Sequence, residues 1–560
     1  MNPNDLKGDK IGVTAFIEDA GEGPSFEGIP FRVEAGEKPP LDGFAVVERD
    51  DTDSLHYGRI ASGHEENPES DPRRQQQNEA YNLGENADLR TGDLSPQVTR
   101  IMTIDPLGEI VFDDGSVSLR QPTDLPQTGQ DVYEVAASNL HTILGLPGPD
   151  EDEGFEIGAI ESGGESAPFK LSREVPARHI AVLGRTGVGK THTSHVLVEE
   201  LVEQGVPVVS FDVLDDAANM AEALGGSTVQ PDSDLQIPYS LLGFSEFEGF
   251  LSNLTDAQKE LVQMVYADIH EDALDQLREE GTVDIGFDRL LDEIETYGNR
   301  ISSKATDKAK SRTRWALINS GLLDSGMDDW AELMSDNPML NIDIGHLGQR
   351  DRTLIIGATA RMLQQLRRRG EVPPFVLVID EAHKYIPSGR SSTPSSRVVR
   401  DLVQTARHIG IGTVLITQSP SSLDQITLRT CNTHVVLSLD SEELSSVKGL
   451  FGDLSKPAID RIPKLEKGKA MVASARDLIQ HTVPVHVRER TTPEGAPTPD
   501  LVNDAREWFE QYDGGDRDYQ DNLGGFETEG GDDDLRTDGG STEPRSGQRS
   551  LGDFHDDHHN

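Results

Sequence analysis

The sequence predicts an α/β fold, in which a domain with a mostly parallel sheet follows a small all-β domain. Three patterns lead to this prediction. Between about residues 169 and 490, short apolar runs alternate with helical patterns, as in α/β domains. From about residue 12 to residue 118, short apolar runs are separated by Gly, Pro and Asp, which favours a small sandwich or barrel. Within residues 241–335 the pattern is wholly helical, so we expect a helical insertion in the α/β core.

The apolar runs of the α/β part define its predicted strands. Each run is short and is bounded by turn or helix signals, as expected for strands buried on both faces. In chain order, the predicted strands are His179–Leu183, Val206–Val213, Asn341–Ile344, Phe375–Ile379, Gly412–Thr417 and His434–Leu439, followed by two late strands at Met471–Ala475 and Val483–Val487.

Composition predicts the domain boundaries. Residues 1–146 form the predicted β domain, in which the polar stretch 63–81 is interpreted as a flexible loop. Residues 147–168 are rich in Gly, Asp and Glu and predict an interdomain linker. After the α/β domain, residues 491–512 form an extension. The Gly/Asp/Glu-rich residues 513–560 contain few apolar side chains and are expected to be a disordered acidic tail.

The chain is strongly acidic. Its 560 residues include 100 acidic and 51 basic side chains, which give a formal net charge of −49. The acid is spread through every region, a pattern typical of halophilic proteins, so net charge says little about any local binding site. A single cysteine, Cys431, rules out an intrachain disulfide and fits a cytoplasmic location. No run approaches the ~18 apolar residues of a membrane span, so we expect no membrane insertion.

A glycine-rich motif follows the first strand of the α/β part. Its sequence, Gly-Arg-Thr-Gly-Val-Gly-Lys-Thr, fits the phosphate-binding pattern G-x-x-x-x-G-K-[ST] and precedes a helical pattern. Backbone N–H groups of such a loop converge on phosphate oxygens, the lysine reaches the β- and γ-phosphates, and the hydroxyl binds Mg²⁺. The predicted nucleoside triphosphate site is therefore Gly184, Arg185, Thr186, Gly187, Val188, Gly189, Lys190 and Thr191.

Two carboxylates follow the buried run Phe375–Ile379. We expect Asp380 to hold the hydrated Mg²⁺ and Glu381 to act as general base on the attacking water. The alternative is an exposed strand end with ordinary charges, which is less common beside a phosphate-binding loop.

Two further polar residues flank the run Gly412–Thr417. If this strand lies between the strands that carry Lys190 and Asp380, Gln418 lies near the γ-phosphate and senses it or orients water; otherwise it faces solvent. Arg407, at a helix end, either stabilises the charge of the phosphoryl group in a neighbouring subunit or interacts with its own helix dipole. Residue patterns leave both alternatives open.

Taken together, these segments resemble the HerA-type ATPases of the FtsK–HerA class of hexameric motors. The resemblance lies in residues 179–191, 378–385 and 406–421, and it continues into Leu423-Asp424 and Cys431-Asn432-Thr433. It implies a RecA-like P-loop NTPase core preceded by a small N-terminal β-barrel. It also implies a ring, usually a hexamer, that hydrolyses ATP with Mg²⁺ to move double-stranded DNA through its pore, often with a NurA-type nuclease in DNA end processing and repair.

By this resemblance, Lys190 and Thr191 are the phosphate and Mg²⁺ groups, Asp380 and Glu381 are the Walker-B pair, Gln418 is the sensor, and Arg407 is the trans-acting finger. One departure is Ala406-Arg407-His408, where many relatives have Gly-Arg-Lys. The missing lysine weakens the argument that this segment carries positive charge to DNA.

Candidate DNA contacts are Lys384, Arg390, Arg397 and Arg400, in or after a Gly/Ser/Pro-rich segment that could project into a pore. We interpret Arg367-Arg368-Arg369 instead as a cationic end of a helix, where the dipole favours positive charge.

Two other functions remain open. One is a conjugation- or secretion-type motor that acts at a membrane. The other is a scaffold ring whose nucleotide binding gates a partner nuclease or defence effector.

Overall fold

The protein forms two compact units, residues 1–497 and residues 498–560. The second unit contains one described helix, α16 (Leu501–Gln511). Among the helices of the described ranges, none combines the length and apolar character needed to cross a bilayer. The computed structural model describes residues 2–16, 23–49, 54–66, 99–113, 116–148, 154–162, 164–214, 216–251, 254–299, 303–389, 393–493 and 500–511.

The N-terminal sheet is antiparallel and has the strand order β2-β1-β7-β3-β4-β5-β6. Strand β2 also pairs with β5, so the pairing returns on itself through six of the seven strands. Ile11, Phe31 and Ile60 lie among its buried apolar side chains. The elements are α1 (Pro3–Leu6), β1 (Lys7–Thr14), β2 (Ile29–Val33), β3 (Phe44–Glu48), β4 (Ser54–Glu66), β5 (Thr99–Asp113), β6 (Ser116–Arg120), β7 (Asp131–Val135), η3 (Ala137–Asn139) and α3 (Leu140–Leu144).

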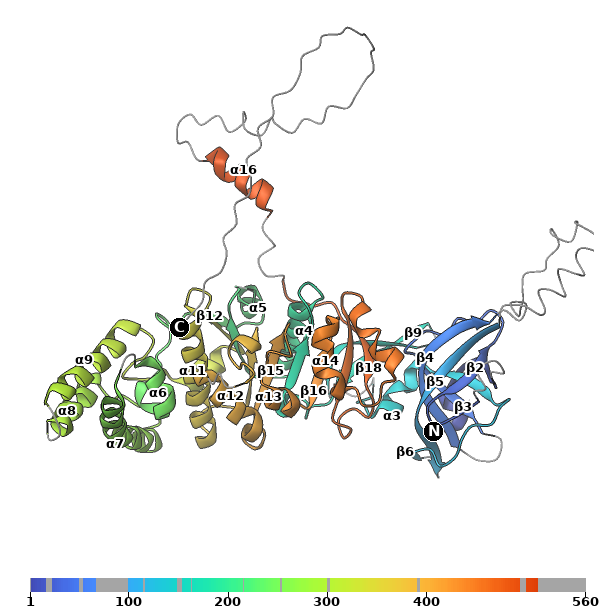
Figure 1. The fold of residues 1–560 in the computed structure, drawn as a ribbon, viewed down its shortest axis with the longest axis horizontal. Coiled ribbons are helices and arrows are strands. Elements are labelled where there is room, and N and C mark those ends of the chain that lie inside the picture. Colours follow the sequence, from blue (N-terminus) through green and yellow to red (C-terminus); the bar gives the residue numbers. More distant parts are fainter. Residues whose placement is uncertain are drawn as a thin grey trace, which may run out of the picture. The chain divides into compact units, whose positions relative to one another are not determined.

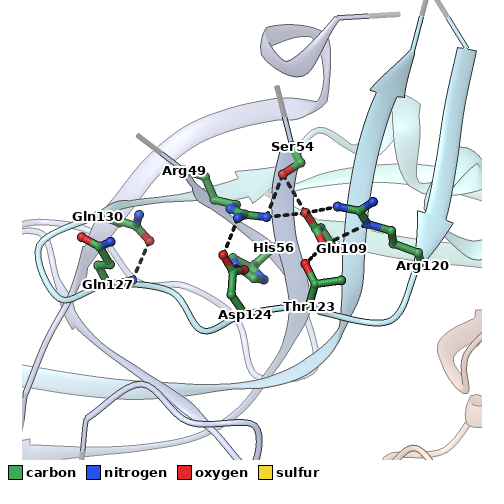
Figure 2. A network of polar contacts seen from close by, with 9 residues as sticks. All are labelled: Arg49, Ser54, His56, Glu109, Arg120, Thr123, Asp124, Gln127 and Gln130. Carbon is green, nitrogen blue, oxygen red and sulfur yellow. Dashed lines mark hydrogen bonds and ion pairs between the residues drawn. The ribbon is translucent and has the colours of Figure 1, made fainter. Parts of the chain in front are cut away.

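A buried carboxylate ties three strands of this sheet together (Figure 2). Glu109 of β5 accepts hydrogen bonds from Ser54 of β4 at 2.8 Å and from Arg120 of β6 at 3.0 and 3.1 Å, and it pairs with Arg49. Burial alone would raise the pKa of Glu109, but the bonds from Arg120 and Ser54 and the charge of Arg49 lower it to about 2. Glu109 is therefore a structural anion of the sheet.

The second sheet has eleven strands, in the order β12-β13-β11-β14-β15-β10-β16-β17-β18-β8-β9. The first seven are parallel, and the remaining pairings are antiparallel. The strands are β8 (Phe155–Ser162), β9 (Glu165–Leu171), β10 (Ile180–Leu183), β11 (Val208–Asp212), β12 (Ser227–Val229), β13 (Met339–Asp343), β14 (Phe375–Ile379), β15 (Ile411–Thr417), β16 (Thr433–Val436), β17 (Lys469–Ser474) and β18 (Val483–Val487).

Helices cover both faces of the parallel strands, which explains their continuous apolar sequences. Ile180 and Val182 of β10 belong to the same buried cluster as apolar residues of α4 (Lys190–Glu203) and α5 (Ala218–Ala223), whereas Ala181 and Leu183 face the cluster formed by α11 (Gln349–Arg369) and α12 (Pro394–Thr405). Shorter helical elements complete this part: η4 (Pro176–Arg178), η6 (Ala382–Lys384), η7 (Ala406–Ile409), α13 (Gln425–Thr430), α14 (Ser441–Val447), η8 (Lys448–Leu450), α15 (Lys456–Ile459) and η9 (Ile462–Lys464).

The helical insertion connects β12 to β13 at one edge of the large sheet (Figure 1). The buried Tyr266 hydroxyl donates to the carbonyl oxygen of Tyr239 at 2.6 Å and to that of Leu242 at 2.8 Å, so it ties its own helix to the turn at the start of the insertion. Its elements are η5 (Tyr239–Leu241), α6 (Phe244–Phe250), α7 (Asp256–Glu280), α8 (Phe287–Gly298), α9 (Ser303–Ser320) and α10 (Trp330–Asp336).

The linker predicted at residues 147–168 is wrong, because strands β8 and β9 occupy most of it. Gly, Asp and Glu dominate its composition, yet Phe155, Ile157 and Ile160 are buried and β8 pairs with β18. The loop predicted at 63–81 is also wrong at its start, since β4 continues to Glu66. The rest of that stretch and the predicted tail 513–560 lie outside the described residues.

Candidate active site

The phosphate-binding motif forms a tight loop between β10 and α4. Gly187 and Gly189 adopt φ angles of 82° and 108°, which only glycine adopts without strain. At Gly184 a Cβ would lie 2.9 Å from Cγ2 of Val188, so the loop also requires a small residue there. In the described structure, the N–H groups from Thr186 to Gly189 donate to no backbone carbonyl, and the N-terminus of α4 opens directly onto the loop. These features suit a bound polyphosphate.

Lys190 lies between the loop and two carboxylates. Its Nζ donates to the Arg185 carbonyl oxygen at 3.1 Å. Burial lowers the pKa of Lys190, while the charges of Glu381 and Asp380 oppose this shift. The lysine is thus held at the carboxylate end of the site, where it would also meet the terminal phosphates of a nucleotide.

Asp380 and Glu381 follow β14 at the same edge of the sheet as the loop. Burial raises the pKa of Asp380 to about 6, although the N–H of Glu381 donates to its Oδ1 at 2.7 Å. Glu381 has a left-handed backbone, with φ of 49° and ψ of 39°, which is strained for a residue with a Cβ. Burial lowers the pKa of Lys190 and the charges of both carboxylates raise it, so both lie close to the lysine at this strand end.

Gln418 joins β15 to both neighbouring strands. Strand β15 lies between β10 and β14, the order required for Gln418 to reach the phosphate loop. Its Oε1 accepts from the Thr186 hydroxyl at 2.5 Å, and its Nε2 donates to Oε2 of Glu381 at 3.4 Å. Gln418 therefore lies between the loop and the predicted general base.

A small cavity beside α4 is lined by Thr191, Asp212 and Asp380, among others. A hydroxyl and carboxylates are oxygen ligands of the kind that Mg²⁺ prefers, and Mg²⁺ usually keeps water and phosphate oxygens as its other ligands. The residues present therefore fit a magnesium–nucleotide complex, in which Thr191 and Asp380 would hold the ion.

Two further residues belong to this site and were not predicted from the sequence. Asp212 ends β11 and accepts hydrogen bonds from the N–H groups of Leu214 and Ala217, both at 2.9 Å, and its charge helps raise the pKa of Asp380. His383 places Nδ1 3.3 Å from Oε2 of Glu381 and 3.0 Å from the hydroxyl of Thr417. The signal for Asp212 was present, because it is a carboxylate at the end of a buried strand.

Arg407 lies at the opposite edge of the sheet. It belongs to η7, which precedes the first residue of β15, whereas the phosphate loop and Gln418 lie at the other end of that strand. Seven residues of β15 separate the two edges, which corresponds to about 20 Å. Arg407 is exposed and does not reach the phosphate loop of its own chain.

The candidate DNA contacts fall into separate environments. Arg400 donates to Asp424 at 2.7 Å and is partly buried, so its charge is neutralised within the fold. Lys384 and Arg397 are exposed, and Arg390 lies outside the described residues.

The arginine cluster that ends α11 has structural partners. Arg367 donates to the Val372 carbonyl oxygen at 3.2 Å, and Arg369 donates to that of Leu274 at 2.9 Å. Cys431 is buried, and burial raises the pKa of its thiol to about 12, as expected for a core residue.

The segment after β18 is fastened to the helix that starts at Lys190. Glu199 of α4, whose side chain is fully buried, accepts from the N–H groups of Thr491 and Thr492 at 2.9 and 2.8 Å and from Arg488 at 2.8 Å. His192, one residue after Thr191, places Nε2 2.8 Å from the carbonyl oxygen of Arg488. The position of α4 is thus coupled to the end of the first unit.

The chain is similar to proteins of one helicase family. The family described as "Helicase HerA, central domain" matches residues 155–363, a match that begins at β8. "DNA double-strand break repair helicase HerA" of Sulfolobus acidocaldarius is 21% identical over 376 residues, which cover 63% of this chain and 72% of the relative. The protein of that name in Pyrococcus furiosus is 23% identical over 406 residues, 63% of this chain and 72% of the relative. Among solved structures, VirB4 of Thermoanaerobacter pseudethanolicus aligns with a TM-score of 0.47 and 14% identity, covering 62% of this chain and 99% of that one.

Proposed function

Because the chain is a HerA-type ATPase of the FtsK–HerA superfamily, we propose that it forms a hexameric ring. This ring uses ATP to move double-stranded DNA. The observation that carries this proposal is the convergence of Lys190, Glu381 and Gln418 at one edge of the sheet, with Arg407 at the other.

The residues have distinct roles in the proposed hydrolysis. The glycine loop and Lys190 bind the phosphates, and Thr191 and Asp380 hold Mg²⁺, which neutralises charge on the phosphates. Glu381 accepts a proton from the attacking water, and Gln418 orients that water or senses the γ-phosphate. The hydrogen bond between Gln418 and Glu381 would link these two tasks.

A ring explains the position of Arg407. An exposed arginine about 20 Å along β15 from the phosphate loop cannot serve its own site, but it can face the loop of a neighbouring copy. There its guanidinium would stabilise the charge that develops on the phosphoryl group. The active site is then complete only between two subunits.

We also propose that this motor acts in the cytoplasm. Its proposed role is to process DNA ends for repair, together with a NurA-type nuclease. The relatives named for double-strand break repair support this role. The closed circuit of strand pairing through β2 and β5 supports a small barrel as the N-terminal domain. The net charge of −49 supports work at high salt, in which self-repulsion is screened.

The direct test is ATP hydrolysis by the full chain with and without linear double-stranded DNA, over a series of KCl concentrations. We expect DNA to stimulate hydrolysis by wild-type protein and Lys190→Ala to abolish it. A scaffold ring would bind ATP, but DNA would not stimulate its ATP hydrolysis. A hydrolysis rate that is the same with and without DNA at every salt concentration would therefore contradict the proposed motor function.

A further inference from the structure

Helix α9 of the insertion is basic within an acidic protein. Its eighteen residues contain five Lys or Arg and one acidic residue, Asp307. The adjacent helix α7 has the opposite character, with eight acidic and two basic residues. Because the whole chain carries about two acidic residues for each basic one, this helix stands apart from its surroundings.

Packing within the insertion explains two of the five cations. Lys310 pairs with Asp292 at 3.4 Å and with Glu295 at 2.5 Å, both on α8. Arg312 donates to Oε1 of Gln258 on α7 at 3.2 Å. Lys310 therefore neutralises carboxylates of α8, and Arg312 hydrogen-bonds to an amide of α7, so both side chains have structural partners.

The other three cations, Lys304, Lys308 and Arg314, point away from this packing. All three are exposed, and within the described residues none has a carboxylate at ion-pair distance. At 3.6 residues per turn, the three positions fall within about 120° of one another around the helix axis, so they lie on one side of the helix. Asp307 is the single acidic residue on that face.

Apolar side chains lie on the same face. Trp315 is 59% exposed and Ile318 is 55% exposed. They follow Lys308 and Arg314 at helical spacing, so the face combines cations with an aromatic ring. A solvated helix face that served only solubility would not require an exposed tryptophan.

We propose that this face of α9, defined by Lys304, Lys308, Arg314, Trp315 and Ile318, binds the sugar–phosphate backbone of double-stranded DNA. The inference rests on the proposed function and adds a contact surface that lies in the insertion (Figure 1). The three cations pair with phosphates, and Trp315 packs against the sugars between them. The face recognises shape and charge, so the contact is independent of base sequence.

Charge complementarity favours DNA over an unspecified protein partner. Phosphates are strongly repelled by most of this acidic surface, so a local basic face selects where DNA makes contact. Charges interact over about 10 Å at 0.1 M salt, and on α9 itself five cations stand against one acidic residue, Asp307. From Lys304 to Arg314 the helix advances about 15 Å, the length of four to five base pairs.

The test compares two variants that lose the same charge. The first, Lys304→Gln/Lys308→Gln/Arg314→Gln, removes the cations of the α9 face. The control, Arg32→Gln/Lys38→Gln/Lys456→Gln, removes three exposed cations elsewhere. Binding of a fluorescent 30-base-pair duplex to the full-length chain is measured by anisotropy from low to high KCl.

We expect the α9 variant to bind at least tenfold more weakly at low salt than wild type or control. Each lost phosphate contact changes the slope of log K against log[salt] by about 0.9, so three contacts change it by about 2.7. Trp315→Ala should weaken binding without changing the slope. Circular dichroism and thermal unfolding establish that each variant is folded.

The outcomes separate this inference from the proposed function. If wild type binds the duplex and the α9 variant matches the control in affinity and slope, the α9 face does not bind DNA. The proposed motor function is then unaffected. If wild type neither binds the duplex nor hydrolyses ATP faster in its presence, both proposals are refuted.

Discussion

Gln418 donates a hydrogen bond from Nε2 to Oε2 of Glu381, at 3.4 Å, while its Oε1 accepts from Thr186 of the phosphate loop. One side chain on β15 therefore connects the loop that follows β10 with the carboxylate that follows β14. A change at the phosphates can reach the proposed general base through this amide.

Glu381→Gln should retain ATP binding but slow hydrolysis by about 10²–10⁴-fold, because the amide cannot accept the proton of the attacking water. ATP turnover and binding of a fluorescent nucleotide measure the two effects. Glu442→Gln, an exposed carboxylate on α14, is the matched control and should hydrolyse ATP normally. Unchanged turnover in Glu381→Gln would remove this residue from the mechanism.

Gln418→Ala should lower kcat by tenfold or more, which corresponds to about 1.4 kcal/mol, with a smaller effect on KM. The reason is that the amide would act on the water or the γ-phosphate during the reaction. Thr186→Ala removes only the bond that positions Gln418 and should have a weaker effect of the same kind. A rise in KM alone would indicate that Gln418 contributes to nucleotide binding and not to the chemical step.

Arg407→Ala should abolish most hydrolysis even though the residue lies far from the phosphate loop of its own chain. Mixing this variant with Lys190→Ala should restore part of the activity, because some interfaces then combine an intact loop with an intact arginine. The measurement is ATP turnover as a function of the mixing ratio. If the ATP turnover of every mixture equals the sum of the low turnovers of the two separate variants, Arg407 does not act in trans.

Glu199→Gln should destabilise the attachment of residues 488–493 to α4 by about 3 kcal/mol, because it leaves Arg488 and the N–H groups of Thr491 and Thr492 without their buried anion. Denaturant unfolding measures the loss. Limited proteolysis should cleave this segment faster than in wild type. A variant with unchanged stability and cleavage would show that the attachment is dispensable.

Acidification should destabilise the contact between the N-terminal sheet and the larger sheet. The hydroxyl of Tyr57 lies 2.8 Å from Nε2 of His481, and burial lowers the pKa of His481 to about 4. The unfolded chain binds this proton near pH 6.5 and the folded chain only near pH 4, so stability is complete above pH 6.5 and is lost as the pH falls towards 4.

Between pH 7.5 and 4.5, wild type should therefore lose about 2–3 kcal/mol more stability than His481→Gln. His486→Gln, at an exposed position, should behave like wild type. Free energies of unfolding at the two pH values give the comparison. Equal acid sensitivity in wild type and His481→Gln would contradict the assignment of this buried histidine.

The centre of the sheet could be predicted because its strands are buried on both faces and each is marked by a local signal. The run Phe375–Ile379 has the same bounds in the structure. Strand β15 lies between β10 and β14, which meets the condition that the sequence left open for Gln418. Asp212 was not predicted although it ends a buried strand, because a single carboxylate at a strand end is a weaker signal than the adjacent pair Asp380 and Glu381.

The remaining features depend on contacts between distant residues. Arg488 and Glu199 are 289 residues apart, and no local pattern indicates that they meet. Strand β8 could not be predicted from its Gly- and Glu-rich composition. Its extended backbone is stabilised by pairing with β18 and β9. The contact between Glu381 and His383 depends on the left-handed backbone at Glu381, which the sequence does not reveal.

The measurement that tests the central claim most directly is ATP-dependent displacement of a third strand from a triplex at the end of a long DNA duplex. A ring that moves along duplex DNA should release the third strand with ATP, and Lys190→Ala and Glu381→Gln should not. DNA-stimulated hydrolysis by wild type without any release of the third strand would contradict the account, because ATP would then be consumed without movement.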